Sequence, residues 1–352
     1  MASREGVYIT AREFGLVADH RGLAHSSGPP AFMKILFVTA TRIGDAVLST
    51  GLLSHLVETY PDARFTIGAG KVAAPLFEAV PRLERMIVIE KQRYGLHWLD
   101  LYARVVRRRW DLVVDLRGSA LAYLLLARKR RVRGKGARDE PRLCQLGRLF
   151  DLDPPPSPHL WTMPKHEDVA SVLVPPGGPV LAIGPAANWR GKTWRAERFA
   201  ELARRLTASA GILPGARVAV LAAAHERPQA APVLDAISPE RRIDLVGRTD
   251  LLTAAAVVRR CALFVGNDTG LMHIAAAVGA PTVALFGPSP VIHYAPWGPR
   301  TAVARTTLSR AALTATPGYD YRTTDTLMDS LSVDAAEATA RELLQRLAAG
   351  AA

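Results

Sequence analysis

Three short groups of polar residues each follow an apolar, strand-like run. The first group, 42–45, comes directly after the run 34–39 and ends in Asp45. At a helix start, the Asp45 carboxylate either caps backbone N–H groups or takes a proton from an attacking hydroxyl as a general base. The turn lacks the G-x-G-x-x-G pattern, so the dinucleotide-binding fingerprint is absent.

The second group, 266–273, follows another strand-like run and opens a helix. Thr269 and Gly270 at that helix N-terminus would leave free N–H groups and the positive end of the helix dipole, which together bind phosphate. His273 would lie one turn further in, facing the anion. A capped helix with a core histidine is the alternative, but a diphosphate site explains Asp268, Thr269, Gly270 and His273 together.

The third group, 188–194, follows the run 180–184 and contains Asn188 and Lys192. Lys192 can reach a phosphate as a point charge, whereas the alternative is a solvated loop. Glu226 follows the run 218–221, and a glutamate at the carboxyl end of a strand can bind ribose hydroxyls. It can equally cap an exposed helix.

The elements that must position these groups are short strand-like runs, which alternate with stretches of helical periodicity. This alternation is typical of βαβ units and parallel sheets. Proline-rich stretches interrupt the alternation between 151 and 178. We therefore predict two similar α/β domains with the site between them. The expected divisions are an arm or upstream start at 1–32, an N-terminal domain at 33–165, a linker at 166–178, a C-terminal domain at 179–332 and a C-terminal helix at 333–352.

The net charge of +13 is concentrated in one window, because Arg93 to Arg148 holds 15 Lys or Arg against 5 Asp or Glu. The window contains the basic run Arg128, Lys129, Arg130 and Arg131. This run is either a solvated helix face or flexible loop, or a patch that attracts phosphates or anionic lipid headgroups. Two distant cysteines exclude a disulfide scaffold and favour a reducing compartment, and no uninterrupted apolar segment predicts a transmembrane helix.

Taken together, these segments resemble glycosyltransferase family 9, the ADP-heptose:lipopolysaccharide heptosyltransferases. The resemblance covers about 33–300. It rests on 33–36 leading into 43–45, and on 115–118, 192–194, 266–273 and 286–289. The early Gly-Asp pair followed by the 268–273 signature is the specific part.

The resemblance implies a GT-B fold, with two tandem Rossmann-like domains, parallel sheets and an interdomain cleft. It implies an inverting sugar transfer that requires no metal or other cofactor. Asp45 matches the general base of the family, and Glu226 matches the contact to the donor ribose. The residues matching the donor diphosphate site are Lys192, Thr269, Gly270 and His273.

The remaining site residues are assigned by their place around these matches. We expect Asn188 on the donor side, and we expect Asp268 to orient its loop rather than react. Gly44, Arg117 and the basic run 128–131 are expected on the acceptor or membrane side. Unlike many family members, this chain has no cysteine within 314–329, so the role of that segment is open.

The implied partners are a nucleotide-sugar donor, an anionic glycolipid acceptor and the inner-membrane surface, which would make this a cytoplasmic, peripheral enzyme without a nucleic-acid partner. Another GT-B nucleotide-sugar transferase or an epimerase is an alternative. A basic nucleic-acid-binding protein is an alternative from a different class. It predicts strongly salt-dependent binding without sugar turnover.

Overall fold

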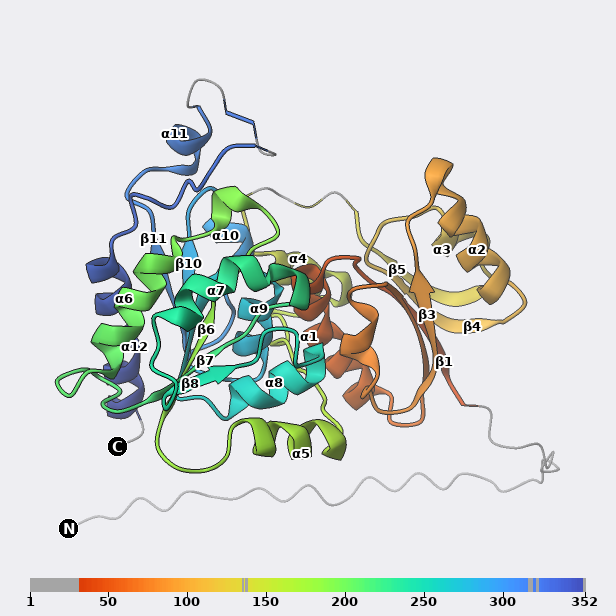
Figure 1. Cartoon of the computed structure of the whole chain (residues 1–352). Helices are drawn as coiled ribbons and strands as arrows, with labels where there is room; N and C mark the ends of the chain where they lie inside the picture. The colour runs from red at the N-terminus through yellow and green to blue at the C-terminus, as the bar shows by residue number, and fades with distance from the viewer. Residues whose placement is uncertain (1–31, 135, 137–138, 316–318, 321–322, 351–352) are drawn as a thin grey trace, which may run out of the picture. The chain divides into compact units, whose positions relative to one another are not determined.

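The computed structural model describes residues 32–134, 136, 139–315, 319–320 and 323–350. The arm predicted at 1–32 lies outside these residues except for Phe32, as do Lys135 and Arg138 of the basic window. The described residues form two parallel sheets, one in the N-terminal half and one in the C-terminal half (Figure 1).

The first sheet has the strand order β3-β2-β1-β4-β5, with every neighbouring pair parallel. Its strands are β1 (Lys34–Val38), β2 (Arg64–Gly70), β3 (Leu83–Ile89), β4 (Trp110–Asp115) and β5 (Ala127–Val132). Its helices are α1 (Ile43–Thr59), α2 (Leu96–Val105), α3 (Leu121–Leu124) and α4 (Arg142–Gly147), with 3₁₀ turns η1 (Ala74–Phe77), η2 (Arg93–Gly95) and η3 (Arg148–Phe150).

The second sheet has the order β11-β10-β9-β6-β7-β8 and is also parallel. Its strands are β6 (Val180–Gly184), β7 (Arg217–Val220), β8 (Arg242–Asp244), β9 (Leu263–Asn267), β10 (Thr282–Phe286) and β11 (Thr301–Arg305). In both sheets the first strand lies centrally and the fourth pairs beside it, which is the Rossmann arrangement.

Helices cover both faces of the second sheet. They are α5 (Pro164–Leu173), α6 (Ala196–Thr207), α7 (Arg227–Asp235), α8 (Leu251–Arg259), α9 (Gly270–Ala277), α10 (Val291–Tyr294), α11 (Arg310–Thr314) and α12 (Val333–Ala349), with 3₁₀ turns η4 (Arg190–Lys192) and η5 (Ala224–Glu226). The predicted C-terminal helix is present as α12, and the side chain of Ser332 caps it by accepting from the Ala335 N–H.

Strand alternation determines which helices cover which face of the first sheet. Ile35 and Phe37 of β1 join the core shared with α1, whereas Leu36 and Val38 join the core beneath α2 and α3. Successive side chains of a strand point to opposite faces, so one buried strand supports two helical layers. Ile274 of α9 also packs into the core shared with α1, which ties the two halves together.

The strands and helices predicted from periodicity are present, and β5, β11 and α5 are among the elements that differ from expectation. The basic run predicted as a helix face or loop is strand β5 at the edge of the first sheet, and β11 was also missed. Helix α5 occupies the start of the predicted linker 166–178, where Ala170 and Val174 join the core of the second sheet. Its short apolar stripe gave too weak a periodicity to be recognised beside the prolines.

Candidate active site

The N-termini of α1 and α9, one from each half, meet at two glycines. A Cβ atom on Gly44 would lie 3.0 Å from the His273 Cδ2 atom, and one on Gly270 would lie 2.5 Å from the Ile43 Cγ2 atom. The close approach of the helices therefore requires glycine at position 270 and leaves little room for a side chain at position 44. Because each helix N-terminus carries unpaired N–H groups and a partial positive charge, their meeting point favours an anion.

Replacement of Gly270 by alanine is expected to force α1 and α9 apart. The added methyl group overlaps Ile43, so we expect a loss of about 1–3 kcal/mol in unfolding free energy and a more than tenfold lower transfer rate. Denaturant unfolding and initial rates measure the two effects. Gly134→Ala is the matched control, because a Cβ there meets nothing within 4 Å. Equal behaviour of the two variants would contradict the close contact.

Beside this meeting point, Lys192 and Asp268 form an ion pair with 2.6 Å between Nζ and Oδ2. The Asp268 side chain is only 6% exposed, whereas Lys192 retains 24%. The ammonium group thus compensates a buried carboxylate while part of it faces solvent, from which it can reach a phosphate. That Asp268 orients its loop rather than reacts stays a prediction.

The loop that carries Lys192 is braced by residues that the sequence did not reveal as important. The buried Asn267 side chain accepts from the Trp194 N–H and donates to the Pro185 carbonyl. The segment 326–331, part of the cysteine-free stretch, adds a bond from the Leu327 N–H to the Gly191 carbonyl. The Trp194 indole N–H in turn donates to Leu331. These bonds fix the backbone on both sides of Lys192.

His273 lies on the first turn and a half of α9 and is 4% exposed. Burial lowers the pKa of its imidazole below the usual value, since desolvation disfavours the charged form. The carboxylates of Asp268 and Asp45 oppose that shift, and Lys192 adds to it. At neutral pH the ring is therefore neutral and can donate one hydrogen bond without bringing a charge.

The lowered pKa of His273 predicts a pH-dependent stability. As pH falls below about 6.5, the unfolded histidine takes up a proton that the folded one resists, so folding free energy is lost. We expect the wild-type free energy of unfolding to fall more steeply between pH 7 and pH 5 than that of His273→Gln. Urea unfolding of both proteins at several pH values measures the difference. Parallel curves would contradict the buried neutral histidine.

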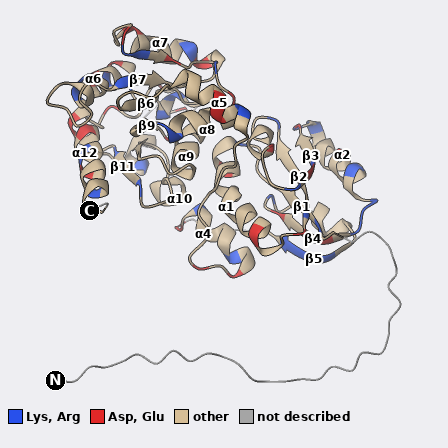
Figure 2. Ribbon diagram, turned by 90° about the horizontal axis from the view of Figure 1, so that it is seen from below, with Lys and Arg blue, Asp and Glu red and all other residues tan. Residues whose placement is uncertain are grey.

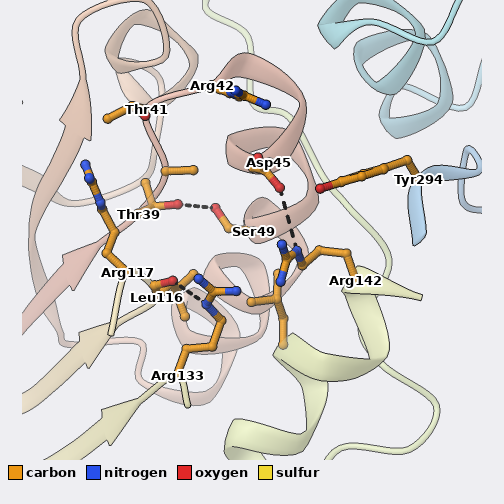
Figure 3. Close-up of a pocket in the computed structure, with 12 residues that line it drawn as sticks. Thr39, Thr41, Arg42, Asp45, Ser49, Leu116, Arg117, Arg133, Arg142 and Tyr294 are labelled. Carbon is orange, nitrogen blue, oxygen red and sulfur yellow. Dashed lines mark hydrogen bonds and ion pairs between the residues drawn. The ribbon is translucent and has the colours of Figure 1, made fainter. Parts of the chain in front are cut away.

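Asp45 faces a pocket of about 420 Å³ next to the meeting point (Figure 3). The residue before α1, Arg42, makes no side-chain capping bond, and the Asp45 Oδ1 atom lies 3.7 Å from the Arg142 Nε atom. The carboxylate is 27% exposed. It is therefore open to a substrate hydroxyl, as a general base requires. The lining residues are Thr39, Ala40, Thr41, Arg42, Asp45, Ser49, Leu116, Arg117, Arg133, Arg142, Leu146 and Tyr294.

Besides Arg42, three arginines from different segments of the chain line this pocket: Arg117, Arg133 and Arg142 (Figure 3). The Arg133 Nε atom donates to the Leu116 carbonyl, and the Arg117 guanidinium lies over the Trp98 ring. Burial lowers the pKa of both Arg117 and Arg133, although both remain charged at neutral pH. Arg142 completes the set. A cluster of fixed cations beside the base suits an anionic substituent on the acceptor.

A second pocket of similar volume shares Thr41 and Arg117 with the first. It lies where β2 and β3 end, and it adds Lys71, Lys91 and His97 to its lining. One Arg117 nitrogen, Nη1, is buried without a hydrogen-bond partner among the described residues. Arg117 therefore lies between the two pockets and offers a donor to a ligand in them.

The other predicted donor-side residues lie in the expected loops, and their roles stay predictions. Asn188 is exposed, and Thr269 is the N-cap residue of α9 without a side-chain capping bond. The Glu226 carboxylate accepts from the Ala223 N–H, so its capping role is present while the ribose role is a proposal.

The basic run 128–131 lies on the edge strand β5, where Arg130 is half-buried and the other three residues are exposed. The Arg130 guanidinium donates to the carbonyls of Ala122, Leu125 and Ala127, and its place on the acceptor or membrane side stays a prediction. Arg128, Lys129 and Arg131 are exposed. Arg131 lies over the Phe150 ring, and Arg128 pairs with Asp111.

Sequence reasoning missed Arg133, Arg142 and Tyr294, although one signal pointed to the first of them. Arg133 follows β5 as Arg117 follows β4, and parallel neighbours end at the same edge. Arg142 and Tyr294 come from short helices that only the folded chain brings to Asp45.

Across the described ranges, no group of three or more His, Cys, Asp or Glu could hold a metal ion. No helix in the described part of the chain is long and apolar enough to cross a membrane.

Comparisons with known proteins agree with this architecture. The model of glycosyltransferase family 9 (heptosyltransferase) matches residues 148–316. Lipooligosaccharide heptosyltransferase 2 of Haemophilus influenzae is 26% identical over 313 residues, 78% of this chain and 88% of the relative. The solved glycosyl transferase family 9 structure from Veillonella parvula has a TM-score of 0.74 and 18% identity, covering 91% of this chain and 100% of that one. The ADP-heptose lps heptosyltransferase II of E. coli has a TM-score of 0.69 and 22% identity, covering 89% and 99%.

Two Rossmann-like halves with a site where their strands end define an enzyme of the GT-B fold, as predicted. Within that class, the chain matches glycosyltransferase family 9, whose model covers residues 148–316. It is a glycosyltransferase, and both the fold and the family expected from the motifs are confirmed.

Proposed function

We propose that this enzyme transfers a heptose from ADP-heptose to a hydroxyl of a lipopolysaccharide-core acceptor, with inversion at the anomeric carbon. The names of the relatives support the two substrates. The observation that carries the proposal is the meeting of α1 and α9 at Gly44 and Gly270. It brings a candidate base from one half against a candidate anion site from the other.

On the donor side, the diphosphate would lie at the N-terminus of α9. The N–H groups following Thr269 and the Lys192 ammonium would meet the negative charge that grows on ADP as it leaves. His273, neutral and buried behind the helix end, would donate one hydrogen bond. Glu226 and Asn188 would contact the nucleoside from neighbouring loops.

On the acceptor side, the reacting hydroxyl would lie in the pocket lined by Asp45. Its oxygen attacks the anomeric carbon from the face opposite ADP, the bond to the diphosphate oxygen breaks, and Asp45 takes the hydroxyl proton. Arg117, Arg133 and Arg142 would hold acidic groups of the acceptor. We include a cytoplasmic setting at the inner face of the inner membrane in the proposal, since a lipid-linked acceptor would be presented there.

Because Lys192 and two helix N-termini supply positive charge, we propose that the reaction needs no metal ion. Transfer rates should then be unchanged by excess EDTA in protein purified without added metal. A loss of rate that Mg²⁺ restores would contradict this part of the proposal.

The test of the whole proposal is release of ADP by the purified protein with ADP-heptose and a series of truncated lipopolysaccharide acceptors. We expect acceptor-dependent ADP release, with UDP- and GDP-sugars inactive. Turnover of a UDP-sugar, with or without an acceptor, would favour another transferase or an epimerase. Salt-sensitive nucleic-acid binding without any sugar turnover would contradict the proposal.

A further inference from the structure

Helices α2 and α3 cover the same face of the first sheet (Figure 1). Several apolar side chains in and next to these two helices are exposed. These exposed residues, which we call the apolar rim, are Tyr94, Leu96, Leu99, Tyr123, Leu124 and Leu126. Tyr94 is 96% exposed and Leu99 64%. Exposed apolar residues gathered on one surface mark a contact with a partner or a membrane.

The charges around the apolar rim are predominantly basic. The acidic neighbours Asp100 and Asp111 are each paired, with Arg104 and Arg128 respectively. Within the described ranges, four further exposed cations before and after α2 and on β5 form no ion pair: Arg93, Arg107, Arg109 and Lys129. Figure 2 shows the Lys and Arg residues along β5 and around α2. The surface thus combines exposed apolar side chains with positive charges that form no ion pair.

We propose that the apolar rim is the surface on which this enzyme binds an anionic lipid bilayer. Leucine and tyrosine side chains enter the boundary between headgroups and acyl chains, while the surrounding cations attract acidic headgroups. The proposal rests on the proposed function only for the lipid anchor of the acceptor. The proposal assigns the membrane contact to the apolar rim and its cations rather than to the basic run 128–131 alone, since the Arg130 guanidinium is bound to backbone carbonyls.

The same turn of α2 connects the apolar rim to the acceptor pockets. Leu96 and Leu99 point outward, whereas His97 between them is buried and lines the second pocket. Trp98 supports the Arg117 guanidinium, which the two pockets share. An acceptor whose lipid stays in the bilayer at the rim would therefore extend its sugars through the second pocket toward Asp45.

Co-sedimentation with vesicles of phosphatidylglycerol and phosphatidylcholine at 1:3 tests the surface. We expect the full chain to bind these vesicles, with binding falling at high salt and being weak to pure phosphatidylcholine. Leu96→Gln/Leu99→Gln and Leu124→Gln/Leu126→Gln should each reduce the partition coefficient at least fivefold. Val172→Gln is the control, because Val172 is an exposed apolar residue on α5, outside the rim.

A second measurement separates a loss of membrane binding from a loss of catalysis. The Leu96→Gln/Leu99→Gln variant should turn over a deacylated, water-soluble acceptor within twofold of wild type but a vesicle-borne acceptor at least fivefold more slowly. Unchanged vesicle binding by both rim variants would overturn the proposal. So would a change of oligomeric state in place of lost vesicle binding, which would make the rim an interface between copies. Rim-dependent vesicle binding without transfer to either acceptor would instead overturn the proposed function and leave the surface standing.

Discussion

Asp45→Asn is expected to fold like the wild type and to lose about 10²–10⁴-fold in kcat. The amide keeps the size and the position of the carboxylate at the start of α1 but cannot accept the acceptor proton. The change should leave the fold intact, because the Asp45 carboxylate makes only a long ion pair of 3.7 Å with Arg142. Acceptor-dependent ADP release and circular dichroism measure the two expectations.

The matched control for this change is Asp62→Asn, an exposed aspartate in the same half that lines neither pocket. We expect wild-type turnover from it. ADP affinity should be the same in Asp45→Asn and the wild type, because the donor groups lie on the other half. Near-normal turnover of Asp45→Asn would remove Asp45 from the mechanism, whereas lost ADP affinity would move it to donor binding.

Lys192→Met is expected to reduce kcat/KM for the donor about 10²–10³-fold, since the developing charge on ADP loses its nearest cation. The same change leaves the Asp268 carboxylate buried without a counter-ion, at a cost of about 3 kcal/mol in unfolding free energy. Steady-state kinetics and urea unfolding measure these two losses separately.

The double variant Lys192→Met/Asp268→Asn separates the two roles of the lysine. Removing the buried charge should restore most of the unfolding free energy, because a neutral amide no longer needs the ammonium group. The transfer rate should remain low. Recovery of the rate together with stability would mean that Lys192 acts only by holding Asp268 and its loop in place.

The two ends of the site could be predicted because their signals are local. A strand-like run, a short turn with Gly44 and Asp45, and a helical stripe occupy neighbouring stretches of sequence, and the same holds for 263–277. Their spacing limits where each carboxylate lies relative to its own helix. The parallel strands then require the turns to gather at one edge of each sheet.

The surroundings of the site could not be predicted in the same way. Strand β5 carries four consecutive basic residues, which no apolar pattern distinguishes from a loop, and only the folded chain brings the Arg130 guanidinium to the carbonyls of Ala122 and Leu125. Arg142 and Tyr294 are far apart in sequence and come from short helices. Their contact with the Asp45 pocket depends on how whole elements pack.

By itself, the sequence determined the two Rossmann-like halves, the helix ends that carry Asp45 and His273, and the family. These depend on hydrophobic periodicity and on short turns, which act over a few residues. Only the tertiary structure decided that Gly44 and Gly270 meet and that Lys192 is paired with a buried Asp268. It also decided which cations line the pocket, which bind backbone carbonyls and which are exposed on the surface. Those outcomes depend on contacts between segments far apart in the chain, where burial determines which charges must be paired and which remain free for a ligand.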